Sequence, residues 1–118
     1  MDISICFADF PTEAIGDTTK RYRQLGIGYA NLGALLMASG LAYDSDGGRA
    51  LAGAITSLMS GITYKRSAEL AGIVGAYDGF ARNAQPHARV MRKHASASSA
   101  AKSFSTDRKS TRLNSSHT

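Results

Sequence analysis

A glycine-rich segment in the first third of the chain is the first place where this sequence could support chemistry. Gly26 and Gly28 have the spacing of a dinucleotide-binding loop, but Asn31 stands where that loop has its third glycine. No acidic residue follows at the distance needed to bind a ribose. We therefore predict that the glycines allow close backbone packing and that Asn31 is buried with its hydrogen bonds satisfied. Phosphate binding is the less favoured alternative.

Two carboxylates and an arginine form a second group. Asp44 and Asp46 could be taken for a pair of catalytic acids, as used in general acid and base chemistry. A simpler interpretation is that one of them caps the N-terminus of a helix, where negative charge is favourable. Arg49 would then pair with Asp46 three residues along the same helix. We predict this structural role.

Histidines and basic residues form a third group. His87 and His94 lie seven residues apart, roughly on one helix face, but no nearby carboxylate or thiolate completes the four ligands of a structural zinc site. We predict that they share a solvated basic face with Arg82, Arg89, Arg92 and Lys93. The alternative is a surface that contacts an anionic ligand or nucleic acid. Because no aromatic residues alternate with the basic ones, we predict no nucleic-acid partner.

Cys6 is the only cysteine, which excludes an internal disulfide and a paired-cysteine metal or redox site. Its neighbours Ile5 and Phe7 predict a buried, unreactive thiol, not a radical-bearing one. The start of the chain lacks the basic region of a secretory signal, so we predict a reducing, cytoplasmic location.

The elements that would position the first of these groups are predicted from periodicity and from breaker residues. Residues 3–9 resemble the end of a helix, residues 12–20 a loop or a single helical turn, and residues 23–28 a short buried strand. A helix is expected over residues 30–39, with Gly40 as its C-terminal stop. The arrangement therefore predicts a strand followed directly by a helix.

A second, longer helix is expected to begin at residues 44–46 and to end near Gly75. Small residues recur in it every four positions and form a stripe that a neighbouring element could approach closely: Gly53, Ser57 and Gly61. A last helix is expected over residues 84–94, capped by Asn83 and with Pro86 in its first turn, where proline is tolerated.

The uncharged run over residues 25–43 is long enough to cross a bilayer, but its glycines and Asn31 make it too polar, so no membrane span is predicted. Residues 96–106 are rich in serine and alanine and are predicted to be unstructured. Residues 107–118 resemble translated sequencing-adapter read-through, which is excluded from fold reasoning. The formal net charge falls from +5 to +3 without the charged residues of that tail: Asp107, Arg108, Lys109 and Arg112.

Three blocks of sequence occur in an order that is specific to one family. The blocks are ADFPTE at 8–13, YRQLGIGYANLG at 22–33 and YDSDGGRA at 43–50. The positions that define this structural motif are Arg23, Gly26, Gly28, Asn31, Gly33, Tyr43, Asp44 and Arg49. Together the blocks resemble the catalytic subunit of adenosylcobalamin-dependent (class II) ribonucleotide reductases, over about residues 4–94.

The resemblance implies a parent enzyme that reduces the 2′-hydroxyl of a ribonucleotide for DNA synthesis. In that family, homolysis of adenosylcobalamin produces a radical that passes to a cysteine, whose thiyl radical abstracts the 3′-hydrogen. A further pair of cysteines supplies the reducing equivalents. The resemblance also implies a ten-stranded α/β barrel, a thioredoxin-like reductant and a homodimer. None of the radical residues maps here, because Cys6, Glu13 and Asn31 are not in the family's Asn-x-Cys-x-Glu loop.

We accordingly predict that residues 1–95 are a mainly α-helical fragment of that α/β barrel, with one short strand and three or four helices. The fragment would be structural and inactive alone, with no catalytic or metal-binding residue of its own. The competing hypothesis is a small helical binding module with a basic C-terminal helix. A helix on a membrane surface is a weaker alternative, because residues 44–62 lack a strong contrast between basic and apolar faces.

Overall fold

The regular structure of this protein is helical. The computed structural model describes the backbone of residues 1–115 and the side chains of residues 1–101. The helices are α1 (Asp2–Phe7), α2 (Glu13–Tyr22), α3 (Leu32–Ala38), α4 (Asp46–Val74) and α5 (Phe80–Ser115). The mainly α-helical prediction is confirmed, but the described residues form five helices where three or four were expected. The side chains of the expected adapter segment, residues 107–118, lie outside the described residues, so that interpretation stays a prediction.

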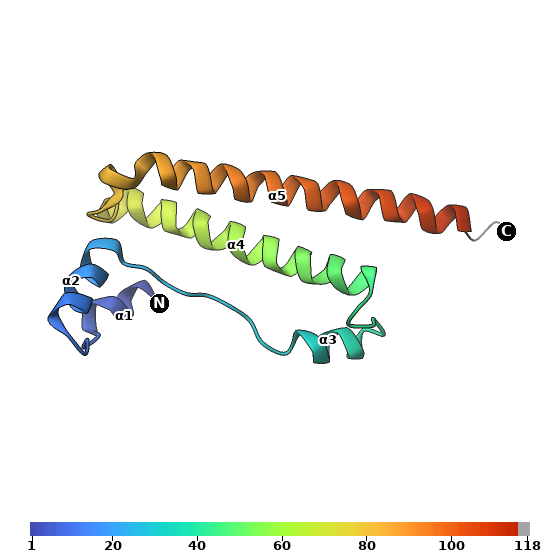
Figure 1. Cartoon of the computed structure of the whole chain (residues 1–118), viewed down its shortest axis with the longest axis horizontal. Helices are drawn as coiled ribbons and strands as arrows, with labels where there is room; N and C mark the ends of the chain where they lie inside the picture. Colours follow the sequence, from blue (N-terminus) through green and yellow to red (C-terminus); the bar gives the residue numbers. More distant parts are fainter. Residues whose placement is uncertain (116–118) are drawn as a thin grey trace.

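A long antiparallel hairpin of α4 and α5 dominates the molecule, and the other elements lie along α4 (Figure 1). α1 and α2 lie near the turn of the hairpin, whereas α3 lies near its open end. An extended segment joins the two groups and runs beside α4. The radius of gyration is 19.4 Å and the extents are 66 × 30 × 22 Å. A compact domain of this length would have a radius of gyration of about 13 Å, so the chain is open.

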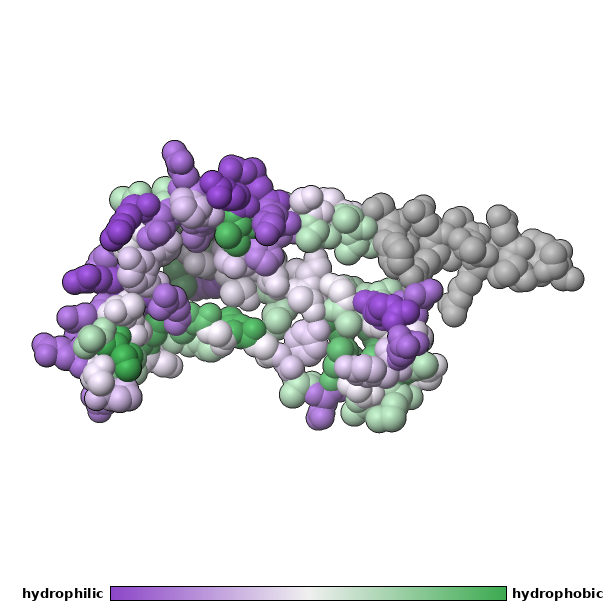
Figure 2. Space-filling view, viewed as in Figure 1, coloured by the Kyte–Doolittle hydropathy of each residue, from purple (hydrophilic) through white to green (hydrophobic). Residues whose placement is uncertain are grey.

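The buried core is small. Among the described side chains, Leu36 of α3 is the only buried apolar one, at 2% exposure. Phe7, Met37 and Ile73, from three different helices, are 78%, 74% and 77% exposed. Figure 2 shows apolar surface along the extended segment and α3, opposite a hydrophilic area over the start of α5. Apolar surface of this extent usually contacts another body. None of the described helices combines the length and apolar character needed to cross a membrane.

Small and aromatic side chains hold the hairpin together. The hydroxyl oxygens of Ser57 on α4 and Ser98 on α5 are 2.8 Å apart. The rings of Tyr64 and His94 contact each other, with centroids 5.3 Å apart. Ser57 of the predicted small-residue stripe therefore faces α5, whereas a Cβ added at either glycine of the stripe would meet open space. The stripe makes one close contact instead of a continuous seam.

The predicted ends of α3 and α4 are confirmed. The N–H of Gly40 donates to the carbonyl of Met37 at 3.0 Å, and the N–H of Leu41 donates to the carbonyl of Leu36 at 2.8 Å. This pair of hydrogen bonds satisfies the last carbonyls of α3. Gly75 ends α4, where its N–H donates to the last turn of the helix.

The start of α4 corrects the predicted cap. Ser45, and neither Asp44 nor Asp46, is the N-cap residue, and its hydroxyl accepts a hydrogen bond from the N–H of Gly48 at 3.0 Å. Serine is among the preferred residues at this position, because its short side chain reaches the unpaired N–H groups of the first turn. Both neighbouring aspartates pair with Arg49 instead.

α2 extends beyond the loop or single turn expected over residues 12–20. Thr12 begins this helix as its N-cap residue, and its hydroxyl accepts a hydrogen bond from the N–H of Ile15 at 3.3 Å. Lys20 and Arg21 lie in the last turn. Their positive charges are favourable there, because the C-terminus is the negative end of the helix dipole. The N-cap threonine and the basic last turn are both present in the sequence. Together they favour a helix more than Gly16 disfavours one.

α5 is longer than predicted at both ends. Because it begins at Phe80, Asn83 lies inside the helix, and its side-chain amide donates to the carbonyl of Gly79 at 2.9 Å. Pro86 is also inside the helix, beyond the first turn where we expected it. The backbone of residues 96–106 is helical, where the sequence predicts no regular structure. Alanine is the strongest helix former, which favours continuation of the helix there.

Residues 24–30 are extended, but the strand predicted over residues 23–28 is not formed within residues 1–115. The N–H and C=O groups of residues 24–30 make no backbone hydrogen bond to any described residue. A strand requires a neighbouring strand to pair with, and this part of the chain supplies none. A side chain attaches the segment instead: the hydroxyl oxygens of Tyr29 and Thr56 on α4 are 2.7 Å apart.

Candidate functional site

The structure brings three of the predicted motif residues together where α3 meets α4. Tyr43, Asp44 and Arg49 line a hollow of about 320 Å³ together with Leu32 and Leu36 of α3. Because Leu36 is the buried apolar side chain, the hollow lies over the best-packed point of the chain. This junction is therefore the candidate site.

A shared ion pair fixes the polar side of the hollow. Nη1 of Arg49 is 2.6 Å from Oδ1 of Asp44, and Nη2 is 3.1 Å from Oδ1 of Asp46. The hydrogen bond with Asp44, followed by that with Asp46, raises the pKa of the Arg49 guanidinium above its ordinary value. The predicted pairing of Asp46 with Arg49 is confirmed. All three side chains are exposed, so solvent screens the attraction between them. The two ion pairs therefore orient the side chains but add little to the stability of the fold.

Gly48 allows the loop before α4 to fold over the first turn of the helix. A Cβ at this position would lie 2.8 Å from the carbonyl oxygen of Ala42 and 3.2 Å from that of Tyr43. Real Cβ atoms do not approach backbone oxygens this closely, so a larger residue would displace the loop. Glycine here keeps Tyr43 and Asp44 against the start of α4.

The glycine-rich group does not assemble into a phosphate site. Gly26 and Gly28 lie in the extended segment, and Gly33 lies in α3, which has only seven residues. Asn31 was expected to be buried, but it is exposed, has a φ of 66° and makes no capping hydrogen bond with its side chain. The correction has a physical reason: no described element covers this position, so the amide stays in water.

Arg23 lies apart from the junction, at the other end of the extended segment. Its Nε and Nη2 atoms donate to Oδ1 of Asp2 at 3.2 and 2.9 Å. The hydrogen bond with Asp2, and then that with Cys6, raises the pKa of the Arg23 guanidinium. Cys6 was predicted to be buried, but it is exposed, with Sγ 3.9 Å from Nη2 of Arg23. No residue of α1 is buried, which explains this error.

Each of the two histidines of α5 contacts a neighbouring aromatic residue. The hydroxyl of Tyr77 is 3.2 Å from Nδ1 of His87, and the ring of Phe80 meets that imidazole edge-on at a centroid distance of 5.6 Å. His94 contacts Tyr64 of α4. The prediction of a solvated face is therefore wrong for His87, which Tyr77 and Phe80 half-bury, whereas His94 is exposed as predicted.

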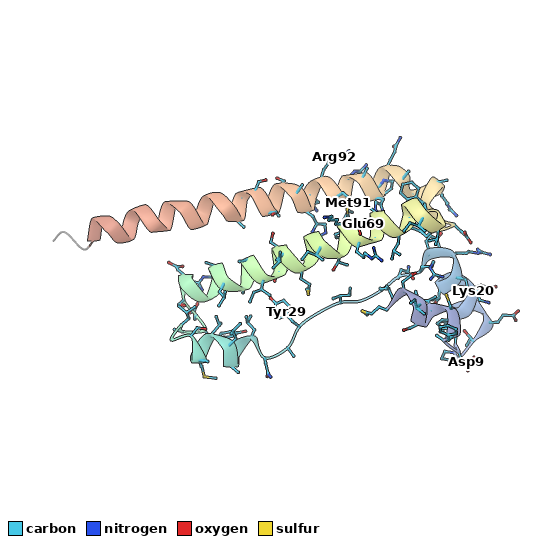
Figure 3. The ribbon with its side chains drawn as sticks, turned by 180° about the vertical axis from the view of Figure 1, so that it is seen from behind. Asp9, Lys20, Tyr29, Glu69, Met91 and Arg92 are labelled. Atoms are coloured by element: carbon cyan, nitrogen blue, oxygen red, sulfur yellow. The ribbon has the colours of Figure 1, made fainter. Side chains whose placement is uncertain are left out.

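The basic residues of α5 remain on its outer side. Arg92 points away from α4, whereas Met91 lies on the side that faces α4 (Figure 3). Among residues 1–101, no ion pair involves the basic residues of this face: Arg82, Arg89, Arg92 and Lys93. The described part of the chain also contains no cluster of three or more His, Cys, Asp or Glu side chains that could hold a metal ion.

Two residues that fix the ends of the extended segment, one within it and one in α1, were not singled out from the sequence. Tyr29 attaches the segment to α4, and its alternation with Leu25 and Ile27 was an available signal for one apolar face. Asp2 pairs with Arg23 across 21 positions, and no local pattern could have indicated so distant a contact.

Comparisons with known proteins agree with the blocks on which the resemblance rests. A family model described as the ribonucleotide reductase barrel domain matches residues 1–116. The chain is 77% identical over 101 residues to a vitamin B12-dependent ribonucleotide reductase of Streptantibioticus cattleyicolor, covering 86% of this chain and 17% of that protein. A protein of the same name from Streptomyces coelicolor is 79% identical over 94 residues, covering 80% and 10%.

A more distant relative of the same name, from Bradyrhizobium diazoefficiens, is 51% identical over 94 residues, covering 80% of this chain and 8% of that protein. The chain thus spans between 8% and 17% of the length of these three curated relatives. No solved structure matches it. The match to the barrel-domain model over residues 1–116 shows the family: the chain belongs to the ribonucleotide reductase barrel-domain family.

Proposed function

We propose that this chain is a wall segment of the barrel of a vitamin B12-dependent ribonucleotide reductase and has no reductase activity alone. The observation that carries the proposal is its 77% identity to a protein of that name, of which it spans 17%. The open form of the chain supports a structural role, because the one buried apolar side chain among residues 1–101 cannot stabilise an independent domain of this size.

The strand expected over residues 23–28 belongs to this proposal. In the longer protein, residues 24–30 pair with strands that lie outside this chain. Their unbonded N–H and C=O groups support this, because such groups are costly to leave unpaired once a protein covers them. The exposed apolar side chains of α3 and α4 would then pack against the other layers of the barrel.

The parent enzyme would convert ribonucleotides to 2′-deoxyribonucleotides for DNA synthesis. Adenosylcobalamin would supply the initiating radical, and a thioredoxin-like protein the electrons. The described residues form no cluster of three or more metal-ligating side chains, and cobalamin needs none, because its corrin ring already holds the cobalt. No step of the reaction is assigned to them. A cytoplasmic location and a homodimeric parent are parts of the same proposal.

A chimeric enzyme tests this function. Residues 1–101 of this chain replace the corresponding segment of the S. cattleyicolor reductase, and deoxyribonucleotide formation is measured with adenosylcobalamin and a dithiol reductant. We expect activity within about threefold of the natural enzyme, because most replaced positions are identical. A matched control carries a Gly/Ser linker of equal length in place of the segment, and the isolated chain is assayed beside it.

Either of two results contradicts the proposal: a folded chimera without activity, or deoxyribonucleotide formation by the isolated chain. The competing binding module with a basic helix makes a different prediction. It requires that the isolated chain unfold cooperatively and give dispersed amide signals, which the small core argues against.

A further inference from the structure

A joint between α1, the end of α2 and the turn of the α4–α5 hairpin lies at the point where the extended segment begins. Its residues are Asp2, Tyr22, Arg23 and Gly79. The contacts of this joint connect residues up to 58 positions apart in the chain, as in the hydrogen bond between Arg21 and Gly79. These contacts lie at one end of residues 24–30, where they can fix the direction in which that segment leaves α2.

Arg23 ends α2 in a conformation that is unfavourable for its residue type. Its φ is 47° and its ψ is 43°, the left-handed region, which L-residues other than glycine, asparagine and aspartate rarely adopt. Its N–H still donates to the carbonyl of Thr19 at 2.7 Å. The chain turns sharply at this residue and leaves α2 in the direction of α4. Glycine would adopt this turn more easily, so the arginine side chain has another role.

The side chain of Arg23 supplies that role by clamping α1. Nε and Nη2 both donate to Oδ1 of Asp2, and Nη2 also donates to the backbone carbonyl of Asp2 at 3.2 Å. Both side chains are about one-third exposed. Several donors of one planar guanidinium on one residue fix direction as well as distance. α1 is thereby held against the start of the extended segment.

Tyr22 fixes the same point to the hairpin. The N–H of Gly79 donates to the carbonyl of Arg21 at 3.1 Å, and a Cβ at Gly79 would overlap the ring of Tyr22. Tyr22 also lies 6.3 Å from Tyr77, between ring centroids. The turn between α4 and α5 therefore sits directly on the last turn of α2, and only a glycine at residue 79 permits this approach.

The far end of the segment is attached as well. Tyr29 meets Thr56 near the middle of α4, six residues after Arg23. Residues 24–28 lie between these two attachments and have no backbone partner of their own among the described residues. The path of the segment is thus set by side chains at its ends and not by hydrogen bonds along it.

We propose that Arg23 is a positioning residue: its clamp on Asp2 aims residues 24–30 so that their backbone is aligned for strand pairing in the parent barrel. The proposal rests on the proposed function, because it concerns how this segment contributes to the reductase. Arg23 touches no reacting group. It acts on the reaction only through the placement of the strand, and a misplacement of about 1 Å far from the chemistry can lower a rate on the order of 100-fold.

The chimeric reductase allows a direct test, with kcat, KM and the melting temperature measured for each variant. Arg23→Gly keeps the left-handed backbone but removes the clamp, and Asp2→Asn keeps the arginine but removes the charge of its partner. We expect each to lower kcat on the order of tenfold, with KM and the melting temperature little changed. The matched control is Arg66→Ala, which breaks an exposed ion pair with Glu69 on α4 and should leave kcat within about twofold.

A charge exchange separates positioning from general damage. Asp2→Arg combined with Arg23→Asp restores an ion pair in reverse, and aspartate tolerates the left-handed region better than arginine does. Recovery of most of the lost kcat supports the proposal. The proposal is overturned if both single variants match Arg66→Ala in kcat, or if the exchanged pair is no better than the single variants. If Arg23→Gly does not fold, Asp2→Asn and the exchanged pair decide by the same criteria.

Failure of this inference is distinguishable from failure of the proposed function. An active unmodified chimera supports the function whatever the Arg23 variants do. An inactive unmodified chimera contradicts the function before any variant is compared.

Discussion

The hydroxyl of Tyr29 lies 2.7 Å from the hydroxyl of Thr56 and joins the extended segment to the middle of α4. Among the described residues, it is the one hydrogen bond that attaches residues 24–30, whose backbone N–H and C=O groups are unbonded. Removal of the Tyr29 hydroxyl should therefore make residues 24–30 more mobile and leave the helices unchanged.

Tyr29→Phe is expected to loosen residues 24–30. The lost hydrogen bond is worth about 0.5–1.5 kcal/mol, which is a roughly two- to twelvefold change in the attachment equilibrium. The measurement is 15N relaxation with glycine-selective labelling, which reports on Gly26 and Gly28, and their order parameters should fall. Tyr43→Phe is the matched control, because Tyr43 is 74% exposed and no hydrogen bond of its hydroxyl is found. Equal effects of the two variants would contradict the role of Tyr29.

The isolated chain is expected to melt gradually, without a cooperative transition. With Leu36 as the single buried apolar side chain among residues 1–101, most helical hydrogen bonds are exposed to water and open independently. Circular dichroism against temperature, read at 222 nm and in the tyrosine region, tests this expectation. A sharp transition that coincides at both wavelengths would instead support an independent module.

Two glycine substitutions should have opposite effects. Gly61→Ala places its Cβ in open space within α4 and should stabilise the helix by about 0.5–1 kcal/mol. Gly79→Ala places its Cβ into the ring of Tyr22 and should separate the hairpin turn from α2, at a cost of about 1–3 kcal/mol. Ellipticity at 222 nm reports the first effect and the near-ultraviolet tyrosine signal the second. A Gly79→Ala chain with an unchanged tyrosine signal would refute the close approach.

The cap of α4 gives a further prediction. Ser45→Ala should destabilise the start of the helix by about 1 kcal/mol, because the N–H of Gly48 loses its acceptor. Asp44→Asn should have a smaller effect, since its exposed ion pair with Arg49 is screened by water. Helix content of the two variants, compared at low and high salt, makes the distinction. A larger loss from Asp44→Asn would show that the aspartate is the cap after all.

Local signals in the sequence predicted much of the fold. Gly40 and Gly75 mark the observed ends of α3 and α4, because the end of a helix depends on residues within one turn of it. The pairing of Arg49 with Asp46 was predicted for the same reason. At the candidate junction, however, the part played by α3 was not predicted, because it depends on how the chain folds back over Leu36.

The wrong predictions concern burial, whereas the expected strand stays a proposal. Cys6 and Asn31 were expected to be buried because of their apolar neighbours, but in this chain few residues lie beneath any covering element. Residues 23–28 carry the composition of a strand, yet a strand needs a partner, and none of the described residues provides one. These signals fit a larger protein better than the segment itself, which agrees with the small share of the relatives that the chain spans.

The bare backbone of residues 24–30 has a consequence for handling the purified chain. Proteases bind their substrates in an extended form. This segment is already extended, and no backbone hydrogen bond has to break before a protease can bind it. Chymotrypsin at low dose should therefore cut first after Leu25 or Tyr29, well before it cuts after Tyr64, the tyrosine inside α4. The initial products would be a short piece carrying α1 and α2 and a long piece carrying the hairpin.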